Sequence, residues 1–442
     1  MAGIAVLSPE QNEKLCRVGP GTLMGAALRA YWLPAVLSEE VAAGGDPLRV
    51  RLLGEDLIVF RDSSGRVGLL GNHCAHRGAS LFFGRNEEAG LRCVYHGWKF
   101  DTTGQCVDMP NEPREFNFRE RVRAVAYPTV ERAGVVWAYM GPRTDPPPLP
   151  DIEWNLVPEQ QRYVTKRVQD CNWAQATEGG IDPSHSGFLH APLHLDLSTA
   201  SPRERYRLDK HPHFSLLETA YGLRIGARRV ADDAHYFWSI THFLMPFYNA
   251  FNSGGQDPQP SVGGFAWVPI DDYTTMAWCF SWNPLRPLGD DEHGDNPRVR
   301  SGVHLPPSAR LPVSTGPGGA WRPLANRSND YLLDREAQRT RRFFGVPGIS
   351  GQDAAVQESM GRIADRSIEH LGSSDGALIR VRRLWLQAAE DAERGVTPVG
   401  VDSPESYRVR ATGFVLERDA DWMAAATDWI TAQPGATAPE LS

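Results

Sequence analysis

The sequence predicts an α+β protein in which an all-β N-terminal part precedes a larger part that mixes strands and helices. Three observations indicate this order. Short β-branched runs separated by turn residues occupy residues 48–70, five prolines crowd residues 142–150, and amphipathic helical spacing begins at Gln352. Strand-rich and helix-rich regions that follow one another are typical of α+β chains. A chain of 442 residues is long enough for two to three domains of roughly 100–200 residues each.

The N-terminal part begins with a predicted β-meander. In "LRVRLLGEDLIVFRDSSGRVGLL" (48–70) the turn residues "GED" and "DSSG" separate three strand-like runs. "FDTTGQCV" and "AVAYPTVERAGVVWAYMG" continue this pattern to about residue 141, where the proline-rich segment indicates a linker. We therefore expect an N-terminal segment over residues 1–30 that packs on the body, a first domain over 31–145 and a second domain over 146–442.

The second part combines strands with a few helices. Strand-like segments ("RYRLDKH", "HFSLLETAYGLRIGARRV" and "TTMAWCFSWNPL") occur between residues 160 and 285, together with a short helix near 172–180. Residues 286–328 are rich in proline and glycine and lack periodicity, which is typical of a functional or mobile loop over a pocket. Helical spacing then predicts a helix from Gln352 to His370, before Gly372, and another over "ALIRVRRLWLQAAEDAERG", closed by Gly395.

Composition and charge exclude several classes of protein. A hydrophobic content of 41% with 23% charged residues is that of a globular chain, and a net charge of −8 argues against a nucleic-acid partner. No apolar run approaches the roughly 18 residues that cross a bilayer. The N-terminus "MAGIAVLSPEQNEKLC" lacks the basic start and the apolar core of a secretory signal. We therefore expect a cytoplasmic protein without membrane association, whose six cysteines are too few for a disulfide framework.

The stretch "CAHRGASLFFGRNEEAGLRCVYHGW" contains two Cys–His pairs, Cys74 with His76 and Cys93 with His96. Three interpretations are open. A disulfide leaves the histidines idle, and a structural zinc site usually pairs cysteine with cysteine and histidine with histidine. A 2Fe–2S cluster in which one iron takes two thiolates and the other takes two imidazoles requires the interleaved order that is present. The glycine after each pair allows a tight turn around such a cluster.

This stretch resembles the Rieske cluster motif of the ring-hydroxylating oxygenases, and "CAHRGASLFFG…CVYHGWKFD" is most similar to the phthalate-dioxygenase-like branch. The resemblance implies that Cys74 and Cys93 bind one iron while His76 and His96 bind the other. Neutral imidazoles in place of thiolates raise the reduction potential of such clusters to about −150 to +300 mV. The expected first domain is therefore an all-β Rieske 2Fe–2S domain that passes single electrons onward.

A second site is indicated by "DCNWAQATEGGIDPSHSGFLHAPLH". His185 and His190 are five residues apart, so a break at Gly187 is needed for both to face one metal. Two histidines and a distant carboxylate form the facial triad of mononuclear iron(II) oxygenases. The segment resembles the catalytic iron motif of the same family, which implies that His185 and His190 bind iron. It also implies that Asp182 links this iron to a cluster histidine across a subunit boundary, although from the residues alone Asp182 is equally a helix cap or turn former.

The third iron ligand is expected far downstream. Several acids lie between residues 353 and 375, in segments whose acidic residues usually form a solvated face. "GQDAAVQESMGRIADRSIEHLG" resembles the C-terminal ligand segment of the family, which implies Asp353 as the ligand, with Glu358 as the next candidate. The same resemblance places Glu178 close to the iron. Whether Glu178 takes part in catalysis beside the metal or is only an acid on the helix surface stays open.

The resemblance implies the oxygenase component of an NADH-dependent Rieske non-haem iron oxygenase, with a helix-grip (START-like) catalytic domain that carries the iron. A separate reductase of the flavin or ferredoxin type is expected, because "GPGTLMG" does not match the dinucleotide fingerprint GxGxxG. The family also implies a homotrimer or a dimer of trimers with head-to-tail contacts. The alternative is a Rieske-type electron-transfer protein without oxygenase activity, which has no need of His185, His190 and Asp353 together.

The expected substrate is a small aromatic compound, an aromatic carboxylate or aryl ether, which the enzyme hydroxylates or O-dealkylates with O2 during aromatic compound catabolism. The bidentate fork of an arginine is the best partner for a carboxylate. Alternation along the strand "GLRIGARRV" puts Arg224 and Arg228 on one face and Arg229 on the other. Ser186, beside His185, is a second polar candidate. The remaining candidate arginines are Arg203, Arg205 and Arg207.

Overall fold

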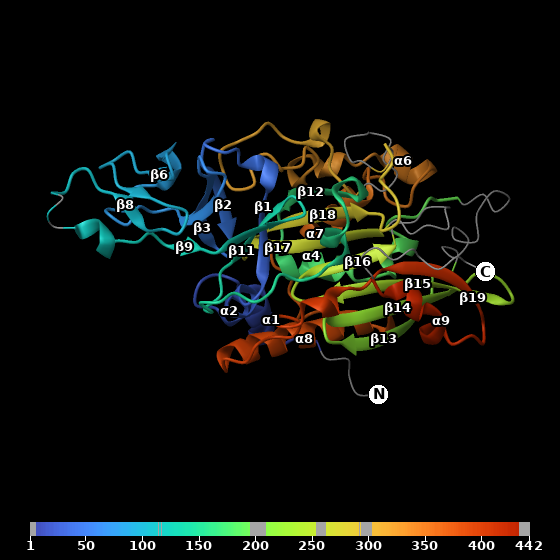
Figure 1. Ribbon diagram of the computed structural model, residues 1–442. Helices are drawn as coiled ribbons and strands as arrows, with labels where there is room; N and C mark the ends of the chain where they lie inside the picture. Colours follow the sequence, from blue (N-terminus) through green and yellow to red (C-terminus); the bar gives the residue numbers. More distant parts are fainter. Residues whose placement is uncertain are drawn as a thin grey trace.

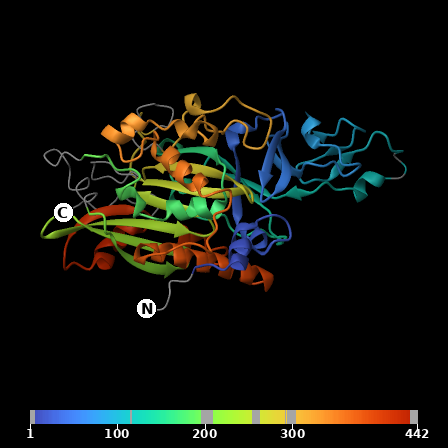
Figure 2. The same cartoon turned by 180° about the vertical axis from the view of Figure 1, so that it is seen from behind.

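The computed structural model describes residues 6–113, 115, 117–194, 209–252, 262–290, 292 and 303–432. A small β-rich part protrudes from a larger part that is built on one long antiparallel sheet (Figure 1). The view from behind shows the same two parts, with the β-rich part again at one end of the molecule (Figure 2). The all-β start and the mixed second part therefore follow the predicted order.

Three antiparallel sheets form the β-rich part. The predicted meander is confirmed, because β2 (Leu48–Leu52), β3 (Glu55–Arg61) and β4 (Val67–Gly71) pair in sequence order, and β9 (Ala126–Tyr127) extends this sheet. A second sheet has the order β5-β6-β7-β8 and contains Arg85–Glu87, Gly90–Arg92, Lys99–Phe100 and Cys106–Asp108. The third sheet has the order β1-β11-β10 and contains Trp32–Leu37, Val135–Tyr139 and Thr129–Arg132. Its central strand β11, "VVWAY", is buried along its whole length, as expected of an apolar β-branched and aromatic run.

An eight-stranded antiparallel sheet forms the larger part. Its strands follow the order β12-β18-β17-β16-β15-β14-β13, and β19 pairs with the part of β15 that β16 leaves free. Two of the three strand predictions are confirmed, since "HFSLLETAYGLRIGARRV" forms the hairpin β13–β14 and "TTMAWCFSW" forms β18. The third, "RYRLDKH", lies mostly outside the described residues, and its last residues are not a strand. The strands are Arg162–Gln169 (β12), His213–Thr219 (β13), Gly222–Val230 (β14), His235–Leu244 (β15), Tyr248–Asn252 (β16), Val262–Asp271 (β17), Thr274–Trp282 (β18) and Thr412–Glu417 (β19).

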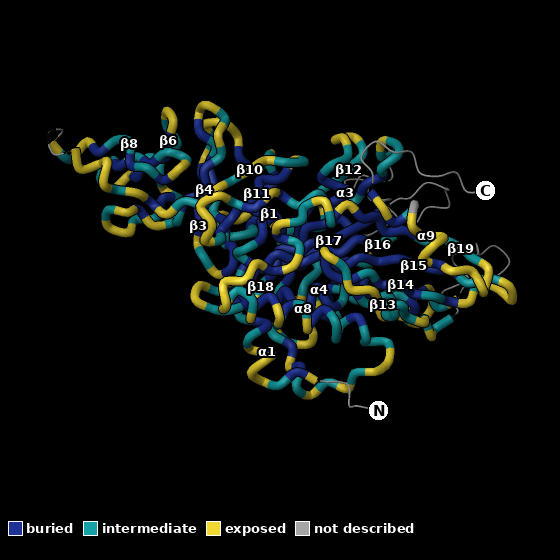
Figure 3. The backbone as a smooth tube through the Cα atoms, turned by 60° about the horizontal axis from the view of Figure 1, so that its bottom comes forward, coloured by how far each residue is buried: buried dark blue, intermediate teal, exposed yellow. Residues whose placement is uncertain are grey.

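One long helix, α8 (Gly376–Glu393), packs along this sheet. Its apolar face is buried, and the Trp385 indole N–H donates to the Pro246 carbonyl at 2.7 Å. The helix ends where Gly395 takes a φ of +71°, a conformation that favours glycine, so the prediction for this helix is confirmed. The N-terminal helices α1 (Pro9–Cys16) and α2 (Leu23–Arg29) also pack on α8. Buried segments are concentrated along strands β14 to β18 (Figure 3).

The predicted helix from Gln352 to His370 is wrong over its second half. The helix α7 covers Ile349–Ser359, and the chain then leaves the helical path at Gly361, whose φ is +99°. The following residues pair with the short helix α4 (Trp173–Gly180), because the Gln175 amide donates to the Gly361 carbonyl and accepts from the Ala364 N–H. These long-range hydrogen bonds replace the local ones that helical spacing alone predicts. The other described α-helices are α3 (Glu153–Leu156), α6 (Arg335–Thr340) and α9 (Trp422–Ile430).

The predicted loop over residues 286–328 is described from residue 303 onward, apart from a short start at 286–290 and residue 292. Its described C-terminal half contains only a 3₁₀ turn at Pro307–Ala309 and the start of another at Arg327. Within the described residues, no helix combines the length and the apolar composition that crossing a bilayer requires.

Candidate functional site

The two Cys–His pairs lie on two turns of the β-rich part that are built alike. In the first turn the Gly78 N–H donates to the Cys74 carbonyl at 2.9 Å, and in the second the Gly97 N–H donates to the Cys93 carbonyl at 3.0 Å. Both glycines have a positive φ, +76° and +81°, which other residues adopt only with strain. We call these two segments, residues 74–78 and 93–97, the cluster turns.

The cluster turns bring the four predicted cluster residues together. Cys74 and Cys93 are buried free thiols, contrary to the disulfide interpretation, and burial together with the neighbouring Cys93 raises the pKa of Cys74 to about 11. The ring centroids of His76 and His96 are 4.4 Å apart. Partial burial and the adjacent His76 lower the pKa of His96, and the His76 Nδ1 is buried without a hydrogen-bond partner. Two adjacent thiols and two adjacent imidazoles, one of them with an unpartnered ring nitrogen, fit a Rieske cluster.

The second predicted group lies just beyond α4. This helix ends at Gly180, and His185 begins a separate 3₁₀ turn that ends at Gly187. The expected break is therefore present, and it leaves the Nε2 atoms of His185 and His190 3.1 Å apart. Asp353 reaches them from the second turn of α7, and its Oδ1 lies 3.2 Å from His190 Nε2 and 3.6 Å from His185 Nε2.

We call His185, His190 and Asp353 the iron triad. Around a metal bonded at about 2.1 Å, cis ligands lie about 3.0 Å apart and trans ligands about 4.2 Å apart. Two of the three separations, 3.1 and 3.2 Å, lie near the cis value, and the third, 3.6 Å, lies midway and does not reach the trans value. The three donor atoms would therefore take one face of an octahedron around a bound metal and leave the opposite face for O2 and substrate. In the described part of the chain, the ligand atoms of these three side chains lie close enough together to hold one metal ion.

Two polar side chains orient the histidines of the iron triad. The Asp182 carboxylate lies 3.5 Å from His185 Nδ1 and accepts the Ser184 N–H at 2.7 Å, and these contacts hold the pKa of Asp182 below its ordinary value although burial opposes this. The Gln352 Oε1 lies 2.7 Å from His190 Nδ1. Since an amide oxygen only accepts, His190 carries its proton on Nδ1 and directs the Nε2 lone pair to the metal position. Gln352 was not predicted from the sequence as a partner of a ligand histidine. Its position next to Asp353 in "GQD" is the signal that could have indicated this role.

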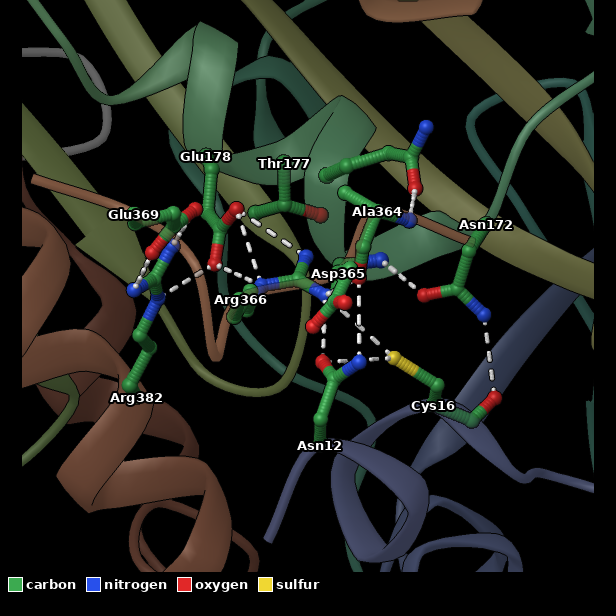
Figure 4. Close-up of polar contacts among 12 residues, drawn as sticks. Asn12, Cys16, Asn172, Thr177, Glu178, Ala364, Asp365, Arg366, Glu369 and Arg382 are labelled. Atoms are coloured by element: carbon green, nitrogen blue, oxygen red, sulfur yellow. Dashed lines mark hydrogen bonds and ion pairs between the residues drawn. The ribbon is translucent and has the colours of Figure 1, made fainter. Parts of the chain in front are cut away.

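Glu178, whose role the sequence leaves open, is a buried acid that contacts two arginines. Both carboxylate oxygens of Glu178 are bound by buried arginines, since Arg366 lies 2.9 Å and Arg382 2.7 Å away (Figure 4). Arg382 also pairs with Glu369 at 2.6 Å. Glu178 is 7% exposed, so it is not a surface acid of the helix either. Its contacts tie α4 to the segment after α7 and to α8 rather than to the iron triad.

The other acid and serine candidates also lie apart from the iron triad. Glu358, the alternative ligand, accepts the Tyr331 hydroxyl at 2.6 Å and the Asp170 N–H at 3.1 Å. The Ser186 hydroxyl donates to the Pro183 carbonyl at 2.9 Å, and Ser186 is not among the described residues on the wall of the cavity described below, so its contact with substrate stays a prediction. Both residues therefore have partners that the local sequence pattern does not reveal.

The candidate arginines divide as the strand alternation predicts. Arg228 stacks on the rings of Tyr236 and Trp238, on the face of the sheet that α9 covers. Arg229 points to the other face and donates to the Pro183 carbonyl at 2.7 Å, beside the iron motif. Arg224 is half-buried on the same face as Arg228. The candidates Arg203, Arg205 and Arg207 lie outside the described residues.

A cavity of about 1090 Å³ adjoins the iron triad. His190 and Gln352 form part of its wall, together with strand β12, helix α7 and the described half of the predicted loop. From the loop, the wall includes His304, whose ring nitrogens contact the hydroxyls of Thr165 at 2.6 Å and Ser281 at 2.9 Å. The loop therefore covers the cavity from one side, as expected, and the cavity is large enough for a substituted aromatic ring.

Comparisons with known proteins agree with both sites. Residues 31–128 match the family described as "Rieske [2Fe-2S] domain", and residues 138–440 match the family described as "LigXa C-terminal domain like". The 3-chlorobenzoate-3,4-dioxygenase oxygenase subunit of Comamonas testosteroni is 41% identical over 93% of this chain and 96% of its own length. The phthalate 4,5-dioxygenase oxygenase subunit of Pseudomonas putida is 36% identical, and the match covers 94% of each protein.

The solved structure of dicamba monooxygenase bound to dicamba is similar in fold, with a TM-score of 0.57 at 20% identity over 83% of this chain and 99% of that chain. The predicted fold class, a Rieske domain followed by a mixed catalytic domain, is confirmed by these matches, as is the resemblance to the phthalate-dioxygenase-like branch. They also confirm the two expected cofactors, a Rieske 2Fe–2S cluster and a mononuclear iron. The chain therefore belongs to the Rieske-type non-haem iron oxygenases and is an oxygenase subunit of a multicomponent system.

Proposed function

We propose that this oxygenase subunit uses O2 to hydroxylate or O-dealkylate an aromatic carboxylate, with electrons that a separate reductase takes from NADH. The observation that carries the proposal is the facial arrangement of the iron triad at the wall of a large cavity. The names of two relatives, which act on 3-chlorobenzoate and on phthalate, support an aromatic acid as the substrate class. An electron-transfer protein without oxygenase activity has no use for such a triad.

The cluster turns and the iron triad have different roles in the proposed reaction. The cluster turns hold the 2Fe–2S cluster through Cys74, Cys93, His76 and His96, and the iron triad holds the mononuclear iron. When bound, the cluster supplies single electrons and the iron supplies a coordination site for O2. Asp182 and Gln352 keep the triad histidines in the tautomer that leaves Nε2 open. The cavity excludes water and holds the aromatic ring beside the iron triad.

We further propose that Asp182 connects the iron of one subunit to the cluster of its neighbour. In a single chain the sheet β5–β8 protrudes from the larger part, away from α4 and α7 (Figure 1). A head-to-tail ring, as a homotrimer or a dimer of trimers, shortens this path because each cluster then meets the next catalytic domain. The half-buried, ionised carboxylate of Asp182 beside His185 suits such a link.

The proline-rich segment 142–150 is the proposed boundary between a Rieske domain over 31–145 and a catalytic domain over 146–442, with residues 1–30 packed on the body. The packing of α1 and α2 on α8 supports the last point. We place the protein in the cytoplasm, because its six cysteines are free, as in a reducing compartment.

Coupled turnover tests the proposed function. Purified protein is mixed with a surrogate reductase, NADH and a panel of aromatic acids, and the consumption of NADH and O2 is measured together with product. We expect equal consumption of NADH and O2 with at least one acid. His185→Ala is the control, and it is expected to keep the cluster absorbance and lose coupled turnover. If the cluster is reduced but none of the added aromatic acids causes O2 consumption, the electron-transfer alternative holds.

A further inference from the structure

A buried arginine lies on the wall of the cavity that adjoins the iron triad. Arg167 belongs to β12, and alternation along the strand puts it on the same face as Thr165 and Gln169. Thr165 contacts His304 of the covering loop, and Gln169 donates to Gln357 of α7. Arg167 therefore lies between the loop and α7. The wall of the cavity includes Arg167 as well as His190 and Gln352.

Among the residues that the structure describes, no carboxylate lies within ion-pair distance of the Arg167 guanidinium, although the charge of Glu358 interacts with it. The side chain is 3% exposed, and its Nε is buried without a hydrogen-bond partner. Three other buried arginines are compensated by a buried acid, since Arg366 and Arg382 contact Glu178 and Arg410 contacts Glu153. A fourth, Arg229, donates to the Pro183 carbonyl. A buried ion without a counter-ion is strongly unfavourable. The uncompensated position on a cavity wall therefore indicates that the counter-ion comes from a ligand.

Two groups close to Arg167 could compensate its charge, Glu358 and Cys279. The two oxygens of Glu358 accept the Tyr331 hydroxyl and the Asp170 N–H, so this acid interacts with Arg167 only through its charge and does not bind the guanidinium directly. Cys279 is in contact with Arg167, and burial raises the pKa of this thiol to about 11, so it is neutral at pH 7. Arg167 is thus a buried cation on the cavity wall that no carboxylate binds directly, whereas Arg322 and Arg341 of the same wall pair with Asp170 and Asp334.

We propose that Arg167 binds the carboxylate of the substrate and so selects aromatic acids over neutral aromatic compounds. This inference rests on the proposed function, because it assumes that the cavity holds the ring to be oxidised. A guanidinium offers two parallel N–H donors that match the two oxygens of a carboxylate, and in a site without water the pair is much stronger than at a surface. With the carboxylate at Arg167, the ring extends across the cavity towards His190. The arginines that sequence reasoning favoured on β14 then have structural roles.

Kinetics with a matched acid and amide test the assignment. The substitution Arg167→Met removes the charge at similar length, Arg167→Lys keeps the charge without the fork, and Arg228→Met is the control on the opposite face of the sheet. The probes are 3-chlorobenzoate and 3-chlorobenzamide, and kcat/KM is measured for each with reductase and NADH. We expect Arg167→Met to lower the preference for the acid by about 30-fold or more, Arg167→Lys to lower it less, and Arg228→Met to leave it unchanged.

A binding measurement separates recognition from a structural role. Without ligand, Arg167→Met is expected to melt at the same temperature as the unmodified protein or higher, because an uncompensated buried charge has been removed. Addition of 3-chlorobenzoate is expected to raise the melting temperature of the unmodified protein and not that of the variant. A lower melting temperature without ligand, together with an unchanged acid preference of Arg167→Lys, overturns the inference and leaves Arg167 a structural residue.

Different experimental results would contradict the proposed function and the proposed role of Arg167. If the unmodified protein oxidises neither probe nor any other aromatic acid, the proposed function is wrong. If it oxidises 3-chlorobenzoate and Arg167→Met keeps the preference for the acid, only the role of Arg167 is wrong. If Arg167→Met lacks the cluster absorbance, this variant has not folded correctly and Arg167→Lys takes its place. An unchanged ratio of kcat/KM for the acid and the amide in Arg167→Lys also contradicts the proposal.

Discussion

Replacement of Gln352 by leucine is expected to weaken the binding of mononuclear iron while the Rieske cluster stays in place. In the structure the Gln352 Oε1 accepts the His190 Nδ1 proton at 2.7 Å, and its amide nitrogen is held by the Val346 carbonyl at 3.0 Å. Leucine has a similar volume but no acceptor, so His190 is free to rotate or to change tautomer. Loss of such an orienting partner typically lowers metal affinity about 10- to 100-fold, which corresponds to about 1.4–2.8 kcal/mol.

The assay is an anaerobic titration of the iron-depleted protein with Fe(II), with the visible absorbance of the cluster as an internal measure of protein integrity. Gln357→Leu is a matched control, because Gln357 is also a buried glutamine of α7 but contacts Gln169 and not a ligand histidine. Gln352→Glu retains an acceptor and is expected to retain iron. Equal affinities for Gln352→Leu and the unmodified protein refute the reasoning, as does an equal loss in Gln357→Leu.

Further predictions concern the cluster, the link between the metal sites and the buried ion pairs. His76→Cys is expected to keep the cluster and to lower its reduction potential, because an anionic ligand replaces a neutral one; an unchanged potential in an EPR-monitored redox titration contradicts the ligand assignment. Asp182→Asn is expected to keep both metals and lose turnover, whereas Asp353→Ala should lose iron and keep the cluster, as metal analysis and coupled assays will show; normal turnover of Asp182→Asn removes the proposed link. Glu178→Gln leaves Arg366 with an uncompensated charge, so the free energy of unfolding should fall by about 3–5 kcal/mol, and denaturant melts with an unchanged midpoint would speak against this. The arginines hold the pKa of Glu178 below its ordinary value of 4.5. The stabilising contribution of Glu178 is therefore present above pH 4.5 and is lost as the pH falls through the lowered pKa. Glu178→Gln should accordingly lose less stability in acid than the unmodified protein.

Local features of the fold followed from the sequence alone. The cluster turns were predictable because their four side chains and two glycines lie in one short stretch, where spacing and backbone preference determine the geometry. The meander before them and the helix that Gly395 ends also depend on neighbouring residues, namely turn formers and an amphipathic period. The shared site of His185 and His190 was predictable in the same way, because it requires only a break in the helical path between them, which is a local property.

Features that depend on distant contacts did not follow from the sequence. The helix from Gln352 was predicted too long, because the hydrogen bonds of Gln175 to the segment after Gly361 join residues far apart in the chain. The role of Glu178 stayed open for the same reason, since helical spacing cannot reveal that two arginines from other elements surround it. Asp353 was assigned through a family resemblance and not from its own surroundings.

The sequence by itself determined the kinds of cofactor and the family, because these depend on short motifs whose residue types and spacing match the chemistry of iron. Only the tertiary structure decided which polar groups orient the iron triad and which cation faces the cavity. Arg167 is one of two adjacent basic residues on a strand, and nothing local distinguishes it from Lys166, which pairs with Glu40. The difference arises from packing, since the energy of a buried charge depends on the groups that surround it in space.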